Sequence, residues 1–310
     1  MDLKGLRLFL GVLRHKSITR AAEHLYIAQP ALGLQIRKLE EEFGLQLLQR
    51  HSRGVTPTEA GLLLAQHAEI LLRQAERAER DLLDYGTTAR GRVSIGLSPT
   101  VSQVMAVVLV ERIRRDLPDV VLTLSEGLSE RLMDRVGKEG IDAALTYNPA
   151  HPGEGIVVEP LVKEVLYFIA PAGSEPGGGT DAEPVTLARA LGRPLVLPSR
   201  PHLLRLIIED RAREIGASVE VGHEVDSVAV MKEFVRCGLG CSVLPFGAVS
   251  QEVRDGRIVA RRIVEPEIER TLHLAFLASR PSSKAFLAVC DLMRTVAGEI
   301  ADRGAAGWRR

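Results

Sequence analysis

The sequence predicts an α/β protein that begins with an all-helical module and continues through one long helix. Three observations support this fold class. Apolar residues recur at three- and four-residue steps twice within residues 17–40. A four-three apolar pattern then runs through residues 64–82. From residue 92 onward, short strand-like segments alternate with helical ones, which is typical of a mostly parallel sheet covered by helices.

Residues 17–40 predict two short helices joined by a tight turn. Ser17 can cap the first helix by accepting a backbone N–H, and Pro30 suits the first turn of the second helix, where no N–H donor is needed. The apolar positions of the two helices are Ile18, Ala21, Ala22 and Leu25, then Leu32, Ile36 and Leu39. A preceding amphipathic helix over residues 3–13 completes a three-helix core.

Two interpretations of this pair remain open from periodicity alone. It is either an ordinary helical hairpin with a solvated face, or a helix-turn-helix whose second helix enters the DNA major groove. In the second case, the N-terminal side chains of that helix reach base edges. The positions that lie off its apolar stripe are Gln29, Pro30, Gly33, Leu34 and Arg37.

The segment after Glu42 predicts a short two-stranded wing. An apolar run at residues 45–48 is followed by polar residues 49–56, with Arg50, His51 and Arg53 at the tip. Such a tip can bind phosphate or enter the minor groove, and the alternative is a solvated basic hairpin.

Residues 56–59 read as a capping box, with Thr56 as N-cap, Pro57 at the first helical position and Glu59 returning a bond. The long helix that follows carries a stripe at heptad spacing, which predicts a dimer seam. The stripe comprises Leu64, Ala68, Leu71, Ala75, Ala78 and Leu82. The alternative is that this stripe packs on the body of the same chain. Gly86 and Gly91 end the helix and predict a hinge.

Composition limits the classes of protein. A length of 310 residues with 45% apolar content is enough for two or three compact units. The formal net charge is zero, yet residues 1–60 carry nine Lys or Arg against six acids and three His. This local excess of +3 would be doubled in a dimer. Aromatic residues, at 4%, do not indicate stacking platforms for single strands.

The N-terminal residues, the apolar runs and the cysteine count indicate where the protein is expected to be located. Charged residues interrupt the first nine positions, and no apolar run reaches membrane-spanning length, so we expect a cytoplasmic protein without membrane contact. Three cysteines, an odd number, fit a reducing compartment. Cys237 and Cys241 flank a Gly-Leu-Gly turn; buried structural cysteines are favoured there over a redox pair.

The second half of the chain predicts two series of strands and helices. Strands are expected at 92–97, 120–124, 141–146, 161–170, 194–197, 219–225, 241–244, 259–264 and 271–277. Helices are expected from Ser98 to Asp116, at 129–136, after Thr186, and at 202–215, 227–236 and 283–300. Gly177–Gly179 reads as a loop and not as a phosphate cradle. The tail after Arg303, which includes Trp308, is expected to be disordered.

The residues at 17–40 resemble the LysR-type transcriptional regulators, whose first module reads roughly S-x-x-x-A-A-x-x-L and then Q-P-A-L-S-x-x-I-x-x-L-E. This sequence supplies Ser17, Ala21, Ala22, Leu25, Gln29 to Leu32, Ile36, Leu39 and Glu40, and Arg53 to Gly61 are similar to the family's wing and linker start. The combination IAQPAL, RGVTPTEAG and SIGL resembles the nitrogen assimilation control branch of that family.

The resemblance implies a winged helix-turn-helix, a linker helix that forms dimers which commonly pair into tetramers, and a two-lobed effector domain like periplasmic binding proteins. Ligand binding between the lobes would reset how the protein bends promoter DNA. The expected domains are 1–58 for DNA binding, 59–90 for the linker helix and 91–303 for effector binding, with a tail at 304–310. Lobe I is expected at about 91–161 and 268–303, and lobe II at about 162–267.

DNA contact is assigned to the helix pair and the wing. Gly33 stands where the family usually has Ser, so one hydroxyl contact is missing, and Leu34 can touch a thymine methyl group. The expected DNA-binding residues are Ser17, Thr19, Arg20, Gln29, Pro30, Gly33, Leu34, Arg37, Arg50 and Arg53.

A ligand site is expected where strand ends meet helix N-termini in the inferred fold, because free N–H groups and partial positive charge favour a carboxylate there. The candidate residues are Ser98, Pro99, Thr100, Tyr147, Ser199, Arg200, His202, Asp226, Ser227 and Phe246. Helix capping by the serines and solvent exposure of Arg200 are the alternatives. Asp226 disfavours a plain anion, so the ligand is expected to be small or zwitterionic, or absent altogether.

These observations predict a sequence-specific, DNA-binding transcriptional regulator, controlled by a small-molecule effector. The alternatives are a redox-sensing regulator that uses Cys237 and Cys241, or a solute-binding module without catalysis. We expect no enzyme, because the sequence has no nucleophile elbow, H-E-x-x-H motif, Walker-type loop or metal-spaced Cys/His cluster. No cofactor or metal is expected, and the expected partners are promoter DNA, an effector and further copies of the chain.

Overall fold

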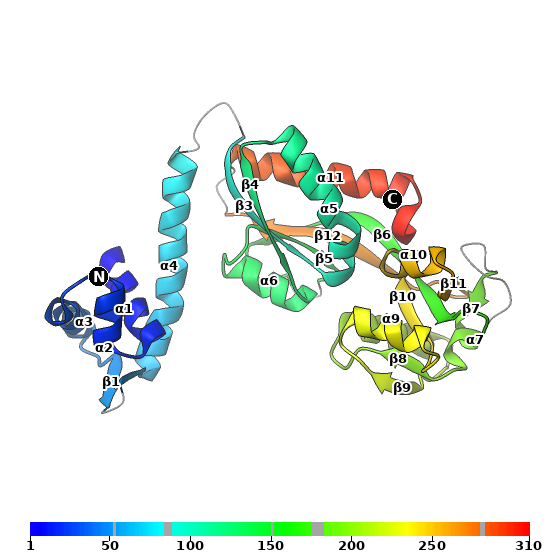
Figure 1. The fold of residues 1–310 in the computed structure, drawn as a ribbon, viewed down its shortest axis with the longest axis horizontal. Helices are drawn as coiled ribbons and strands as arrows, with labels where there is room; N and C mark the ends of the chain where they lie inside the picture. Colours follow the sequence, from blue (N-terminus) through cyan, green and yellow to red (C-terminus); the bar gives the residue numbers. More distant parts are fainter. Residues whose placement is uncertain (52–53, 84–88, 150–151, 175–182, 280–282) are drawn as a thin grey trace. The chain divides into compact units, whose positions relative to one another are not determined.

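The computed structural model describes residues 1–51, 54–83, 89–149, 152–174, 183–279 and 283–310 (Figure 1). The chain divides into two compact units. The first comprises Met1–Gly86 together with Lys138–Gly140, and the second comprises Thr87–Gly137 and Ile141–Arg310. We describe each unit by itself. None of the helices in these ranges is long and apolar enough to cross a membrane.

The N-terminal unit is a three-helix module with a wing and one long helix (Figure 1). Its elements are α1 (Leu3–His15), α2 (Ile18–His24), α3 (Gln29–Phe43), β1 (Leu48–His51), β2 (Gly54–Pro57) and α4 (Glu59–Leu83). The buried residues of this core include Phe9, Ala21, Leu32, Ile36 and Leu39. The apolar stripes that were expected to face the core therefore do so.

Local signals at the helix ends are confirmed for the helix pair. Ser17 Oγ accepts the backbone N–H of Arg20 at 3.3 Å, and Pro30 lies in the first turn of α3. Gly44 ends α3 in the left-handed conformation with φ +63°, which glycine adopts without steric cost.

The wing is attached at both ends to the helical core. Glu40 Oε1 accepts the backbone N–H groups of Leu47 and Leu48 at 2.9 and 3.1 Å. Gly54 lies so close to α1 that a Cβ there would be 2.3 Å from the carbonyl oxygen of Lys16. The wing is therefore restrained against the helical core both at the start of β1 and at the start of β2.

The predicted capping box at Thr56 is wrong, because that residue belongs to β2. Its hydroxyl lies 3.1 Å from His51 Nε2 across the wing. The helix begins two residues later, where Thr58 Oγ1 accepts the N–H of Gly61 at 3.0 Å. Strand pairing with β1 holds residues 54–57 extended, so the first available cap is Thr58.

The predicted stripe on α4 divides between two environments. Leu64 and the fully buried Ala68 pack with Leu6 and Leu72 between α1 and α4. Leu71 and Leu82 are 40% and 75% exposed, Ala78 is exposed and Ala75 is half-buried. The alternative of packing on the same chain therefore holds for the first half of the stripe, and the second half remains available.

The second unit is a two-lobed α/β domain with two main cores. Its strands are β3 (Gly91–Leu97), β4 (Val120–Glu126), β5 (Ala143–Tyr147), β6 (Ile156–Pro171), β7 (Val185–Thr186), β8 (Leu195–Leu197), β9 (Val221–Glu224), β10 (Ser242–Pro245), β11 (Ile258–Val264), β12 (Glu269–Leu277) and β13 (Trp308–Arg309). Its helices are α5 (Pro99–Asp116), α6 (Ser129–Gly137), α7 (Leu187–Leu191), α8 (Leu203–Glu214), α9 (Val228–Arg236), α10 (Phe246–Arg254) and α11 (Lys284–Asp302), followed by the 3₁₀ turn η2 (Ala305–Gly307).

The sheet is mixed and not mostly parallel. Strand β3 pairs in parallel with β4 and β5, as expected, whereas β12 is antiparallel to both β5 and β6. The long strand β6 pairs with β12 in one lobe and with β10 and β11 in the other. The chain crosses between the lobes in β6 and returns through β12, so the two strands must run in opposite directions (Figure 1).

Two further features differ from the expectation. Helix α10 was not predicted, and Phe246 is its first residue. The C-terminal tail is ordered: Trp308 is buried, and β13 pairs with β6 through Trp308 and Glu164. The indole packs in a hydrophobic core and its N–H binds the buried carboxylate of Glu164, and a sequence pattern cannot reveal these distant partners. The Gly177–Gly179 run lies outside the described residues.

Candidate DNA interface and ligand pocket

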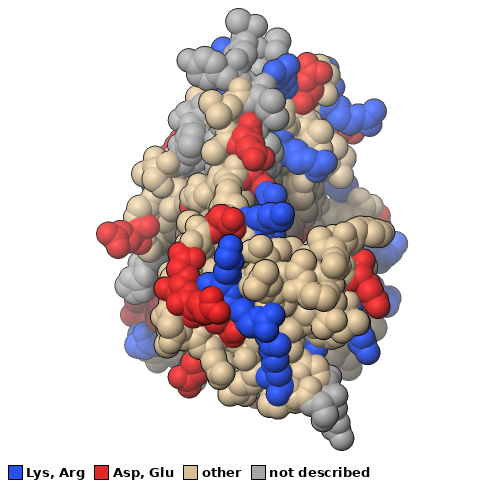
Figure 2. All heavy atoms as spheres, turned by 90° about the vertical axis from the view of Figure 1, so that its left-hand side faces the viewer, with Lys and Arg blue, Asp and Glu red and all other residues tan. Residues whose placement is uncertain are grey.

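Helix α3 presents one exposed face that matches the expected reading surface. Gln29, Pro30, Leu34 and Arg37 are exposed and Gly33 is half-buried, while Leu32, Ile36 and Leu39 fill the core. Figure 2, which views the end of the molecule that carries α1 to α3 in Figure 1, shows Lys and Arg side chains in a band beside acidic ones. The candidate reading residues thus lie on one side of one helix.

Several arginines of this unit are available for phosphate. Arg20, Arg37 and Arg50 are exposed and form no ion pair with the residues that the structure describes. Thr19 is exposed beside Arg20, whereas Ser17 is half-buried as a cap. Arg53, the other arginine expected at the wing tip, lies outside the described residues.

Two positions near the reading face were not fully anticipated. A Cβ at Gly33 would meet no atom within 4 Å, so the missing hydroxyl does not reflect a steric conflict. Tyr26, in the turn before α3, is 96% exposed at φ +55°, a conformation uncommon for an aromatic residue. An unburied phenol ring beside the reading helix is a further candidate for a DNA contact that no sequence motif had indicated.

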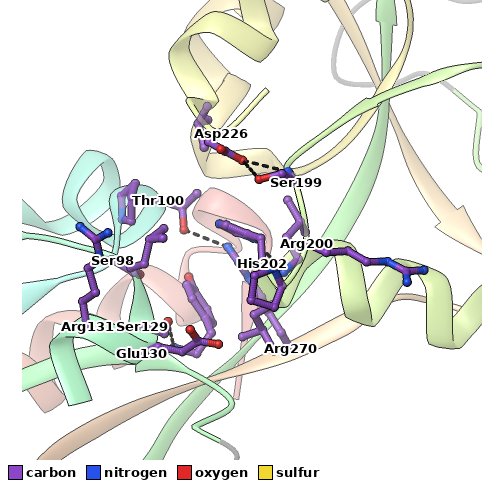
Figure 3. Close-up of a pocket in the computed structure, with 17 residues that line it drawn as sticks. Ser98, Thr100, Ser129, Glu130, Arg131, Ser199, Arg200, His202, Asp226 and Arg270 are labelled. Atoms are coloured by element: carbon purple, nitrogen blue, oxygen red, sulfur yellow. Dashed lines mark hydrogen bonds between the residues drawn. The ribbon is translucent and has the colours of Figure 1, made fainter. Parts of the chain in front are cut away.

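A cavity of about 340 Å³ lies between the two lobes of the second unit (Figure 3). Most of the expected ligand residues line it, namely Ser98, Pro99, Thr100, Tyr147, Ser199, Arg200, His202 and Asp226. Ser227 is not among the lining residues and caps α9 through the N–H of Val230. Phe246 is also elsewhere, with its ring centroid 5.4 Å from that of Tyr167.

The wall at the start of α5 offers hydroxyl groups. Ser98 is 4% exposed, and its Oγ has no hydrogen-bond partner among the described residues. A buried hydroxyl without a partner costs about 1–3 kcal/mol, which a ligand oxygen would relieve. Thr100 Oγ1 accepts from Arg270 Nη2 at 2.8 Å and lines the same wall of the cavity.

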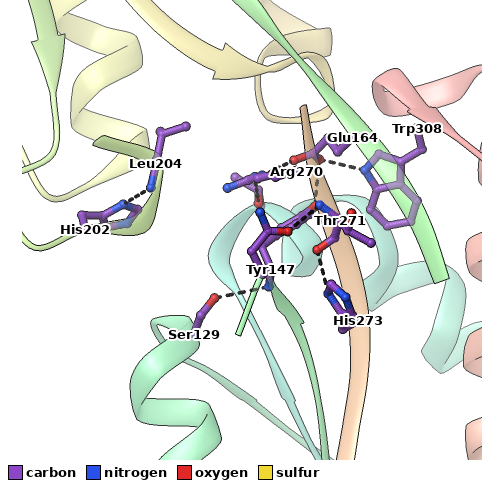
Figure 4. Close-up of polar contacts among 11 residues, drawn as sticks. Ser129, Tyr147, Glu164, His202, Leu204, Arg270, Thr271, His273 and Trp308 are labelled. Atoms are coloured by element: carbon purple, nitrogen blue, oxygen red, sulfur yellow. Dashed lines mark hydrogen bonds and ion pairs between the residues drawn. The ribbon is translucent and has the colours of Figure 1, made fainter. Parts of the chain in front are cut away.

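Arg270 brings a buried cation to this wall. Its Nε donates to Glu164 Oε2 at 2.6 Å, and its guanidinium lies 3.6 Å from the centroid of the Tyr147 ring (Figure 4). Burial is the largest influence and lowers the pKa of Arg270, but the charges and hydrogen bonds of Glu164 and Tyr147 together outweigh it, so the pKa is raised and the side chain stays charged. Burial, followed by the charge of Glu164, raises the pKa of Tyr147 well above its usual value, so its OH remains a donor to Glu164.

His202 is held as a neutral donor on the opposite lobe. Its Nδ1 accepts the N–H of Leu204 at 3.1 Å, which places the remaining ring proton on Nε2. Burial, and then the nearby charge of Arg270, lowers the pKa of His202. The imidazole therefore offers a hydrogen bond without adding charge to the cavity.

Acidic groups lie at the edge of the cavity. Asp226 accepts the N–H and the hydroxyl of Ser199 at 2.8 and 2.6 Å, and these bonds lower its pKa. Glu130 also lines the cavity. Arg200 does not supply a counter-charge, since it pairs with Glu209 at 2.8 Å and Figure 3 shows its guanidinium directed away from the cavity.

Several lining residues were missed by the sequence reasoning. They are Leu128, Ser129, Glu130, Arg131, Pro201, Leu203, Leu204, Val228 and Arg270. Ser129 is the first residue of α6, and its hydroxyl accepts the N–H of Tyr147 at 3.4 Å. Arg270 precedes the strand expected at 271–277 and is the second residue of the observed β12, so the sequence pattern did not single it out as a buried charge.

The two cysteines near α9 have different environments. Cys237 is exposed at the C-cap of α9, whereas Cys241 is buried, with Arg193 Nη1 donating to its Sγ at 3.5 Å. The interpretation of both as buried structural residues is therefore wrong for Cys237. The redox alternative stays a prediction.

Comparison with known proteins decides the family. Residues 3–62 match the family model of the bacterial regulatory helix-turn-helix protein, lysR family, and residues 86–298 match the LysR substrate binding domain. The chain belongs to the LysR family. This LysR-family protein is a DNA-binding transcriptional regulator with an effector-binding domain and not an enzyme.

Named relatives and solved structures agree with that assignment. The nitrogen assimilation regulatory protein nac of Klebsiella aerogenes is 34% identical over 294 residues, covering 94% of each chain. The same regulator of Escherichia coli (strain K12) is 31% identical over 297 residues, covering 96% of this chain and 95% of the relative. Full-length CbnR complexed with its target DNA is similar in fold, with a TM-score of 0.73 and 19% identity over 96% of this chain and 100% of that chain.

Proposed function

We propose that this regulator reads promoter DNA through α3 and the wing, and that a small zwitterionic effector in the interlobe cavity controls it. The Ser98 hydroxyl, which lines the same cavity as Arg270, carries the effector proposal, because it is buried and has no hydrogen-bond partner among the described residues. The working division of the chain is residues 1–58 for DNA binding, 59–90 for the linker helix and 91–310 for effector binding.

The DNA proposal is supported by the exposed face of α3. Gln29 at the helix N-terminus can make a bidentate contact with adenine, and Leu34 can contact a thymine methyl group. Arg20, Arg37 and Arg50 are exposed on the same unit and form no ion pair within the described part of the chain, which leaves them available for phosphate. We assign base recognition to Gln29 and Leu34, and positioning to the arginines.

The chemistry of the cavity favours a ligand with both a carboxylate and a cationic group. Hydroxyls of Ser98 and Thr100, the guanidinium of Arg270 and the N–H of His202 form a set of donors for a carboxylate. Glu130 and Asp226 provide acceptors for an ammonium group. Because Glu164 neutralises Arg270, the cavity has no large excess of positive charge that would select a plain dianion.

The second half of the α4 stripe supports a homodimer. Leu71, Ala78 and Leu82 expose apolar surface at four- and seven-residue steps, which is the spacing of a helix seam. A partner helix on this seam would remove that surface from water and place two reading heads in one molecule. Pairing of such dimers into tetramers would extend the contact to further half-sites.

The test is a footprint on the promoter of the neighbouring gene, repeated with matched small molecules. Each amino acid is compared with its deaminated carboxylic acid and its decarboxylated amine. We expect one amino acid to change the footprint or the DNA affinity while neither of its counterparts does. A panel in which only plain carboxylates act, or in which nothing acts, would refute the zwitterionic effector without touching the assignment of DNA binding.

A further inference from the structure

The C-terminal segment is connected by hydrogen bonds to a side chain that lines the effector cavity. Trp308 is 2% exposed, and its Nε1 donates to Glu164 Oε1 at 2.8 Å, while β13 pairs Trp308 with Glu164 along the sheet (Figure 4). Glu164 is fully buried, so this bond lies in the interior. The last residues of the chain thus supply a donor to a carboxylate in the core.

The same carboxylate holds the cavity arginine. Glu164 Oε2 accepts from Arg270 Nε at 2.6 Å, and Arg270 Nη2 donates to Thr100, which lines the cavity. Tyr147 OH donates to Glu164 Oε1 at 2.8 Å. Thr100, Arg270, Glu164 and Trp308 form an unbroken series of hydrogen bonds, which we call the relay.

The C-terminal segment also contacts both lobes. A Cβ added at Gly247 of α10 would lie 2.5 Å from Val104 Cγ2 on α5 and 2.9 Å from Ala306 Cβ. A Cβ added at Gly307 would lie 3.3 Å from Phe246 Cβ. The segment before Trp308 packs against α10 of one lobe and α11 of the other, so a change in how the lobes meet would alter its packing.

We propose that Trp308 is a positioning residue for the effector cavity, acting through Glu164 on Arg270. This inference rests on the proposed function in that the cavity is taken as the effector site. The relay uses one N–H of Nε and one of Nη2, so a ligand carboxylate would bind at the remaining Nη donors of Arg270 and draw the guanidinium from Glu164. Glu164 would then depend more on Tyr147 and Trp308, and the C-terminal segment would respond to cavity occupancy.

The physical basis is the coupling of hydrogen bonds to one buried acceptor. In a medium of low polarity, each donor to a carboxylate changes the strength of the others, and removing one leaves a charge less well compensated. Three donors from β5, β12 and β13 converge on Glu164. A structural role alone would require only that Trp308 be apolar, whereas positioning requires its N–H.

The chain carries one tryptophan, so its fluorescence reports on the relay directly. In the full-length protein without ligand, we compare the emission maximum and acrylamide quenching of Trp308 in Thr100→Val and in Thr123→Val. Thr100 is the cavity end of the relay, and Thr123 is an exposed residue of β4, which makes it a matched control. Tyr147→Phe removes a different donor to Glu164, so it tests the relay independently of Thr100→Val.

We expect Thr100→Val and Tyr147→Phe to shift Trp308 emission to longer wavelength and to increase its quenching, with Thr123→Val unchanged. Retained circular dichroism shows that each variant is folded. Emission and quenching that are identical in all three folded variants would overturn the relay.

The effect of Trp308 on ligand binding in the cavity is tested with acetate as the carboxylate probe. Trp308→Phe keeps an aromatic ring and removes the N–H, and Arg310→Ala alters an exposed residue of the same segment. We expect acetate binding, measured by calorimetry, to weaken severalfold in Trp308→Phe and to be unchanged in Arg310→Ala. Equal affinities would refute positioning by Trp308. If acetate does not bind the wild type, positioning of a carboxylate by Trp308 is refuted while the zwitterionic effector stands, and the emission comparison still decides the relay.

Discussion

Arg270 and Glu164 form an ion pair inside the effector domain, with 2.6 Å between Arg270 Nε and Glu164 Oε2 and exposures of 5% and 0%. Two charges taken out of water are stable there only because each is compensated by the other and by further hydrogen bonds. The pair ties β6 to β12, the strands that connect the lobes, and places the guanidinium at the cavity.

Breaking this pair should be far more damaging than breaking a surface pair. Glu164→Gln leaves Arg270 uncompensated, so we expect the free energy of unfolding to fall by ~3–5 kcal/mol. Asp210→Asn, which removes the exposed partner of Arg213, should change it by less than ~1 kcal/mol. Urea unfolding followed by Trp308 fluorescence measures both, and similar losses in the two variants would contradict the buried pairing.

Base reading and phosphate contact should separate in DNA-binding measurements. Gln29→Ala should reduce discrimination at one base pair by ~1–3 kcal/mol. Arg50→Ala should weaken binding to all sequences and reduce the salt slope of the binding constant by ~0.9. Arg213→Ala, an exposed arginine already paired, is the control. Loss of base preference in Arg50→Ala would reverse the assigned roles. Arg53→Ala is expected to behave as Arg50→Ala does.

The start of α4 can be located by two threonine substitutions. Thr58→Ala removes the cap on Gly61 N, so we expect a loss of ~1 kcal/mol in stability. Thr56→Ala removes only an exposed contact with His51, so its effect should stay within ~0.5 kcal/mol. Chemical denaturation measures the stability of both variants. A larger loss of stability for Thr56→Ala than for Thr58→Ala would show that Thr56 is the cap of α4.

The stability of the effector domain should decrease at acidic pH, where His202 becomes protonated. Burial and the charge of Arg270 hold its pKa below the unfolded value of 6.5, so the unfolded chain binds the proton first as pH falls. The contribution of neutral His202 to the free energy of unfolding is therefore complete above pH ~6.5. It is lost as the pH falls through the pKa of His202 in the folded protein.

His202→Asn isolates this effect, because asparagine can still accept the N–H of Leu204. We expect the melting temperature of the variant to decrease less than that of the wild type between neutral and mildly acidic pH. Part of the slope should remain, since burial also lowers the pKa of His273. Identical slopes would show that His202 is already protonated or unburied.

The α4 seam can be tested by introducing charge on its exposed half. Leu71→Glu places a carboxylate in the proposed dimer contact, so sedimentation should show a shift toward monomer and weaker operator binding. Glu69→Gln, on another exposed face of α4, is the control. A dimer that is unaffected by Leu71→Glu would assign association to another surface.

Much of the fold was predictable because it depends on local patterns. Helix periodicity located α1, α2 and α3, and caps at Ser17, Thr186 and Ser283 marked helix starts within a residue. The direction of β12 was not predictable, since period-two alternation is the same in parallel and antiparallel strands. Helix α10 was missed because Phe246 directly follows a strand, without the usual polar cap.

The candidate site was predictable in part for the same reason. Ser98, Ser199 and Asp226 precede helices, so their chain positions indicate the strand ends where cavities form. Arg200 was expected to point into the cavity. Its guanidinium points away instead, because it pairs with Glu209 of α8.

By itself, the sequence determined the helix-turn-helix, its exposed reading face and the membership of the family, because helical periodicity and short motifs are encoded in neighbouring residues. Only the tertiary structure decided which charge enters the cavity and what the C-terminus does. Arg270, Glu164 and Trp308 are separated by 38 to 144 residues along the chain. They meet because β6 pairs with both β12 and β13, and such long-range pairing depends on the burial of the whole domain.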